Sequence, residues 1–147
     1  MCLFIESIKV ENRSFQNIEW HNLRLNNTRK DFFGDVEVID ISNIISIPDY
    51  VDNSVFKCRI VYGKSIESVT FEKYIPKKVE TLRLVDFSIA ETFLEKISNS
   101  EKGRSLVIDN YKYKYQNRDL LSYLFNARDG ADDILIVKDG HLTDTSF

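Results

Sequence analysis

Short stretches in which apolar and polar residues alternate dominate the first half of the chain. Residues 3–10 alternate and are rich in β-branched and aromatic side chains, which is typical of a strand. A polar turn at 11–14 leads into a second short run at 15–20. Together the two runs predict a β-hairpin.

A second hairpin is predicted further along the chain. Residues 55–62 and 65–74 both alternate, and the Gly63-Lys64 pair between them supplies the turn. Residues 81–85 predict one more strand of the same lobe.

Between the hairpins, residues 20–33 carry apolar side chains at helical spacing, and Gly34 would end this helix as its C-cap. The opposite, polar face of the helix would carry Arg24, Arg29 and Lys30. Residues 36–51 are apolar, rich in isoleucine and interrupted by a proline, so a strand, a short helix and an irregular arm all remain open.

Helical spacing of apolar residues recurs twice in the second half. Residues 88–98 predict one helix, and residues 118–128 predict another, with Asn117 as its cap and Gly130 after its end. The polar stretch 99–103 between them is the most linker-like part of the chain.

The chain closes on a predicted hairpin, because apolar runs at 134–137 and 142–147 flank Asp139-Gly140. The whole pattern predicts an α+β fold with few helices. We expect a first lobe at 1–86, a linker or insert at 87–107 and a second lobe from 108 to 147.

Composition excludes several classes of function. The 147 residues are 43% hydrophobic and 29% charged, with a net charge of -3, so no basic field attracts nucleic acid or an anionic membrane. Two cysteines cannot form a disulfide framework, and the N-terminus lacks the basic and long apolar regions of a signal peptide. A cytoplasmic protein is expected.

Three separated segments carry the candidate chemistry. They are HNLRL at 21–25, KYQNR at 114–118 and ADDILIVKDGHLTDTSF at 131–147. A guanidinium such as that of Arg24 offers a permanently charged fork that matches phosphate oxygens. A lysine such as Lys114 is the side chain that condenses with an aldehyde.

These segments resemble the fold-type IV enzymes that depend on pyridoxal 5'-phosphate (PLP), which include aminodeoxychorismate lyases and branched-chain and D-amino-acid aminotransferases. The resemblance implies that Arg24 grips the cofactor's phosphate and that Lys114 is the Schiff-base lysine that moves the substrate's α-proton. It also implies that Asp144 pairs with the pyridine nitrogen and keeps it protonated. By the same resemblance, the chain would be a homodimer that acts on a small amino substrate.

Each candidate residue has a simpler interpretation. Arg24 could be a solvated helix arginine, Lys112 competes with Lys114, and Asp144 could be a polar residue at a frayed terminus. Glu6 is expected to face outward from its strand. His21 is expected to pack beside Trp20, and no spacing of histidine and cysteine predicts a metal site.

Two departures from the family pattern bear on function. Residues 87–107 look like an extra segment, and relatives continue after TDTSF with strands whose backbone N–H groups hold the phosphate, so the second lobe is expected to be incomplete. The leading hypothesis is 4-amino-4-deoxychorismate lyase, an activity of folate biosynthesis. The alternatives are an amino-acid aminotransferase, or an inactive remnant that acts as an interaction module.

Overall fold

The computed structural model describes residues 2–34, 36–91, 93 and 113–146. These residues form two compact units. The first contains residues 2–34, 36–76 and 113–117, and the second contains residues 77–91, 93 and 118–146. The predicted α+β class, with few helices and both antiparallel and parallel strand pairs, is confirmed.

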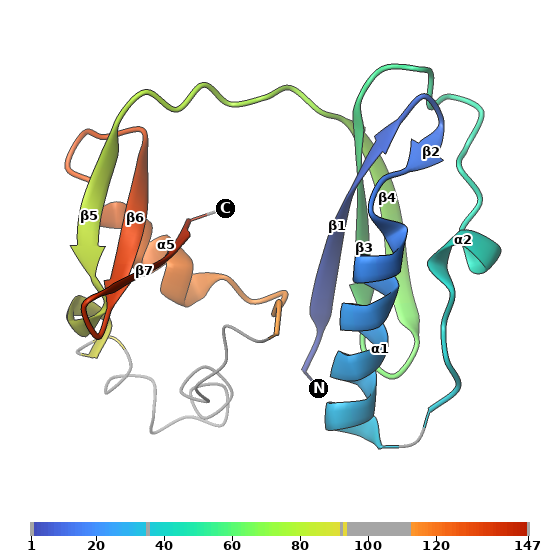
Figure 1. The fold of residues 1–147 in the computed structure, drawn as a ribbon, viewed down its shortest axis with the longest axis horizontal. Coiled ribbons are helices and arrows are strands. Elements are labelled where there is room, and N and C mark those ends of the chain that lie inside the picture. The colour runs from blue at the N-terminus through green and yellow to red at the C-terminus, as the bar shows by residue number, and fades with distance from the viewer. Residues whose placement is uncertain (1, 35, 92, 94–112, 147) are drawn as a thin grey trace. The chain divides into compact units, whose positions relative to one another are not determined.

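An antiparallel sheet with the strand order β2-β1-β3-β4 forms the body of the first unit (Figure 1). The strands are β1 (Phe4–Glu11), β2 (Ser14–Phe15), β3 (Phe56–Tyr62) and β4 (Ile66–Lys73). Both predicted hairpins therefore exist. The partner strand in the first is only two residues long, because the chain turns into a helix at residue 18 instead of 20.

One face of this sheet is covered by helix α1 (Ile18–Phe33). Gly34 ends the helix as predicted, with a φ of 76° and its N–H donated to the carbonyl of Lys30 at 3.0 Å. The core beneath α1 contains the residues of β1 and β3 that alternate toward the helix. These and the other buried core residues are Phe4, Ile8, Val10, Leu25, Ile41, Ile45, Val51, Phe56, Cys58, Ile60 and Tyr62.

Polar side chains on a second stripe of α1 hold the segment that the sequence left open. Asn26 donates to the carbonyl of Ile39 at 2.7 Å and accepts the N–H of the same residue at 2.8 Å, as a neighbouring strand would. Asn22 accepts the N–H of Ile41 at 2.9 Å, at the start of the short helix α2 (Ile41–Ile44). The segment is therefore fixed by hydrogen bonds from side chains rather than by backbone hydrogen bonds between strands.

Arg29 completes this stripe and corrects the sequence-based expectation. It was predicted to lie on the polar face of the helix, but only 4% of it is exposed. Its guanidinium donates twice to the carbonyl of Lys64, at 3.0 and 2.8 Å, and once to that of Glu37 at 2.7 Å. Carbonyls that lie far apart in sequence replace the water that a surface arginine would bind.

The second unit is a three-stranded sheet in the order β5-β6-β7. Strand β5 (Leu82–Asp86) runs parallel to β6 (Asp133–Lys138), and β6 pairs antiparallel with β7 (His141–Thr145) across the predicted Asp139-Gly140 turn. Both turn residues have positive φ, at 51° and 74°, which is the conformation that this dipeptide favours.

Helix α5 (Asp119–Asn126) and the 3-10 helix η1 (Phe87–Ala90) pack on this sheet. The core contains Val85, Ala90, Leu124, Ile134 and Ile136. The residue at the cap position of α5 is Arg118, not Asn117 as predicted. Most of the predicted helix at 88–98, and most of the linker at 87–107, lie outside the described residues.

The expected boundary near residue 87 is not where the two units divide. Strand β5 was predicted to belong to the first lobe, but it pairs with β6, about 50 residues later in the chain. Asp132 secures this pairing, since its carboxylate accepts the N–H of Glu80 and the N–H and hydroxyl of Thr81, all at 2.9 Å. A parallel partner so far away in sequence leaves no local signal.

No helix among the described residues is long and apolar enough to cross a membrane.

The Asn26 side chain gives a test of how the 37–41 segment is held. We expect Asn26→Ala to lower the free energy of unfolding by about 2 kcal/mol, because the N–H and carbonyl of Ile39 both lose their partner. Chemical denaturation followed by circular dichroism measures the change. Asn27→Ala, at the exposed neighbouring position of α1, is the matched control and should change stability by less than about 0.5 kcal/mol.

Candidate functional site

A carboxylate that is fully buried marks the candidate site in the first unit. Glu6 in β1 has no exposed surface, yet three donors surround it. Arg24 donates from Nε to Oε1 at 2.7 Å and from Nη2 to Oε2, and His21 shares a hydrogen bond with Oε2 through Nδ1 at 2.7 Å. A buried carboxylate needs such partners, since an unpaired charge in the interior is strongly unfavourable.

Local structure brings these three residues together. Glu6 lies between Phe4 and Ile8 in the alternation of β1, so its side chain points to the face covered by α1. His21 and Arg24 are three residues apart on α1 and therefore share one face of the helix.

The charges within this cluster stabilise one another. Burial alone would raise the pKa of Glu6, but the hydrogen bonds and charges of Arg24 and His21 outweigh it and lower the pKa below its ordinary value of 4.5. The hydrogen bonds to Glu6 in turn raise the pKa of Arg24. Both groups are thus ionised near neutral pH, and Arg24 with Glu6 forms a neutral pair.

Tyr62 adds a buried phenol to this neighbourhood. It lies opposite Phe4 in the sheet register, has no exposed surface, and interacts electrostatically with Glu6 and Arg24. Burial raises the pKa of its hydroxyl to about 12, so the phenol stays neutral. Thr28 lies beside the hydroxyl and opposes part of that rise. The two groups do not reach hydrogen-bond geometry, and no other described residue bonds the phenol.

Arg24 retains donors for a further acceptor. A guanidinium has five N–H groups, and the two bonds to Glu6 use one on Nε and one on Nη2. No other acceptor among the described residues bonds this side chain, which is 39% exposed. The pair of N–H groups on Nη1, with the remaining one on Nη2, forms a second fork whose chemistry fits a phosphate.

The segment that contains Lys114 is bonded to β1, beside Glu6. The N–H of Ile5 is donated to the carbonyl of Lys114 at 2.8 Å, and the N–H of Gln116 is donated to the carbonyl of Leu3 at 2.9 Å. Tyr115 lies opposite Phe4 in an antiparallel bridge. Residues 114–116 of the KYQNR motif thus extend the sheet along the edge of β1 that β2 leaves open.

Aromatic packing sets the orientation of this segment. The rings of Tyr113 and Tyr115 lie 6.4 and 5.0 Å from that of Phe4, and Tyr113 is also 4.9 Å from Phe32. Side chains alternate along an extended segment, so Lys114 leaves the backbone on the opposite side from the two tyrosines. The competing Lys112 lies outside the described residues.

Asp144 belongs to the second unit and is exposed on β7. Its Oδ1 accepts the N–H of Thr145 at 2.8 Å. The buried carboxylate of this unit is instead Asp133, which accepts the N–H of Ile134 at 2.8 Å and the hydroxyl of Ser146. Arg118 donates to the carbonyl of Ser146 at 2.9 Å, so the end of the described chain is fixed to its own unit.

One expectation about the site was wrong, because Glu6 was predicted to face outward and is fully buried. His21, expected to pack beside Trp20 and the helix start, also bonds that carboxylate. The sequence did contain a signal, because Glu6 has the same parity in its strand as the core residues Phe4 and Ile8. A charged residue at a core position of a strand points to a buried partner.

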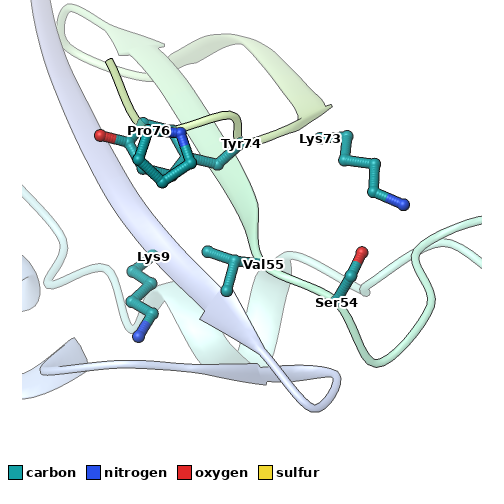
Figure 2. A pocket seen from close by; sticks show the side chains of 6 residues that line it. All are labelled: Lys9, Ser54, Val55, Lys73, Tyr74 and Pro76. Atoms are coloured by element: carbon teal, nitrogen blue, oxygen red, sulfur yellow. The ribbon is translucent and has the colours of Figure 1, made fainter. Parts of the chain in front are cut away.

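A hollow of about 310 Å³ lies at one end of the sheet in the first unit (Figure 2). It is lined by Lys9, Ser54, Val55, Lys73, Tyr74 and Pro76. Figure 2 shows the two ammonium groups pointing away from each other, and their nearest carboxylates are Glu11 at 2.8 Å and Asp52 at 3.9 Å. The hollow therefore presents lysine stems rather than convergent charge.

Other chemistries have less support in the described part of the chain. No group of three histidine, cysteine or acidic residues there could hold a metal ion. Burial raises the pKa of the Cys58 thiol to about 12, so this cysteine is a core side chain rather than a thiolate nucleophile.

Comparison with known proteins supports the fold. No family model matches the chain. An uncharacterised protein of Haemophilus influenzae is 27% identical over 149 aligned residues, which span all of this chain and 69% of that protein. The crystal structure of a provisionally assigned 4-amino-4-deoxychorismate lyase from Haemophilus somnus superposes with a TM-score of 0.76 at 21% identity, covering 100% of this chain and 69% of that one.

A provisionally assigned amino-acid aminotransferase from Mesorhizobium loti superposes with a TM-score of 0.65 at 15% identity, covering 100% of this chain and 68% of that one. Similarity at this level of identity concerns the fold rather than the reaction. The chain has the α+β fold-type IV architecture of these two solved structures.

The Glu6 cluster predicts a specific dependence of stability on pH. Because the Glu6 pKa is lowered in the folded state, its ionisation stabilises the fold above pH 4.5, and this contribution is lost as pH falls through the lowered pKa. We expect Glu6→Gln to cost about 3 kcal/mol at pH 7 and to flatten the acid limb of the stability curve. Urea denaturation from pH 7 to pH 3 measures both.

Glu67→Gln, at an exposed position of β4, is the matched control and should follow the wild-type curve. A Glu6→Gln variant with the same acid sensitivity as the wild type would show that Glu6 does not stabilise the fold as an ionised group.

Proposed function

We propose that the chain binds PLP and catalyses a lyase or aminotransferase reaction of class IV, with 4-amino-4-deoxychorismate lyase as the best match. The observation that carries the proposal is that the segments of two candidate residues, distant in sequence, are both bonded at the start of β1. Lys114 is bonded to Ile5 through its backbone, and Arg24 is bonded to Glu6 through its side chain. The fold and its structural neighbours support this assignment.

Each candidate residue has a separate task in this proposal. Arg24 binds the phosphate with the fork that Glu6 leaves unused. Asp144 supplies the carboxylate that keeps the pyridine nitrogen protonated. When bound, PLP withdraws electrons from the substrate's α-carbon and makes its proton removable.

Lys114 is the base and acid of the reaction in this proposal. Its primary amine would hold the cofactor through the aldehyde, and the same amine would take a proton from the substrate's α-carbon and return one later. The lyase then releases pyruvate, whereas an aminotransferase passes the amino group to a second substrate. The residues of the first unit serve either outcome, and the neighbours include enzymes assigned to both.

A binding module without catalysis is the second candidate, and an apolar surface of the second unit favours it. Leu82, Leu84 and Leu142 are 51%, 63% and 64% exposed. Their register with β6 places them on the face of the sheet opposite the core residues Ile134 and Ile136. Exposed leucines that share one face of a sheet are typical of a contact surface.

Reductive trapping separates these candidates. We expect the purified protein, mixed with PLP and treated with borohydride, to carry one phosphopyridoxyl group on Lys114, located by peptide mass spectrometry. Lys114→Ala should lose this modification, and Lys112→Ala should keep it. Modification of Lys112 instead would reassign the lysine, and a protein that binds no PLP would favour the binding module.

A further inference from the structure

The Glu6 carboxylate bonds one particular edge of the Arg24 guanidinium, and this gives it a role beyond neutralising the charge. Its two oxygens meet Nε and Nη2 of Arg24, which lie along one edge of the guanidinium plane. Two bonds to a planar group fix both its position and its rotation about the side-chain axis. The direction of the remaining fork is therefore set by Glu6.

We propose that Glu6 is a positioning residue that aims the free fork of Arg24 at the phosphate of the cofactor, and that His21 holds Glu6 in the orientation this requires. This inference rests on the proposed binding of PLP and adds two residues that do not themselves touch the ligand. The backbone of Glu6 is fixed, because β1 is hydrogen-bonded along its length to β3, and this gives the carboxylate a defined position.

His21 contributes by fixing the carboxylate. Its Nδ1 lies 2.7 Å from Oε2, the oxygen that also accepts from Nη2 of Arg24. The His21 side chain is 17% exposed and lies one helical turn before Arg24, so both donors reach the carboxylate from α1. With both donors in place, the carboxylate cannot rotate without breaking a bond.

Two other roles for the ion pair predict different changes in phosphate binding when Glu6 is removed. If Glu6 only neutralised Arg24, its removal would free a positive charge and strengthen the binding of phosphate. If the pair only stabilised the fold, its removal would change stability and leave phosphate recognition as it was. Positioning alone predicts weaker phosphate recognition, because a guanidinium that rotates freely loses entropy when it binds.

The experiment compares PLP with pyridoxal, which lacks the phosphate. Dissociation constants for both are measured by absorbance titration of the wild type and of Glu6→Gln, in the temperature range where thermal denaturation shows each protein folded. We expect the ratio of PLP to pyridoxal affinity to fall roughly tenfold in Glu6→Gln, with pyridoxal affinity unchanged. A milder variant, His21→Gln, should lower the ratio less, in the same direction.

Asn26→Ala is the matched control, since it weakens the same helix packing without touching the cluster, and its ratio should equal that of the wild type. An unchanged or increased ratio in folded Glu6→Gln overturns the positioning role and leaves the proposed function intact. If the wild type binds PLP no better than pyridoxal, both proposals fall.

Discussion

A fully buried carboxylate is the constraint on which the first unit depends. Glu6 occupies a core position of β1, and an ionised group can remain there only if charged and polar partners replace water. Arg24 and His21 provide them from one face of α1, which requires the helix to dock in a single register. The same pairing that removes the penalty of burial also orients the guanidinium.

Polar side chains of α1 also hold the irregular segment that follows the helix. Asn22, Asn26 and Arg29 bond the backbone of the segment between α1 and β3, while Leu25 and Thr28 face the core. The helix thus has an apolar stripe, a stripe that anchors a loop and a stripe that carries the candidate site. Its weakly amphipathic sequence reflects three surfaces, each with its own partner.

The two candidate residues of the first unit reach β1 by different routes. Arg24 arrives through side-chain bonds to Glu6, and Lys114 arrives through backbone bonds beside Ile5 that an aromatic cluster of Tyr113, Tyr115 and Phe4 secures. Segments about 90 residues apart are joined on one strand.

Local pattern in the sequence determined the hairpins, α1 with its Gly34 end, and the Asp139-Gly140 turn, because alternation, helical spacing and turn chemistry act over a few residues. The resemblance of three short segments also indicated the fold. Only the tertiary structure decided that β5 pairs with β6, that Arg29 is buried and that Glu6 bonds Arg24 and His21. Each of these depends on groups that are distant in sequence, so the neighbouring residues in the chain carry no signal for it. Hydrogen bonds to those distant groups are what make the buried polar residues stable.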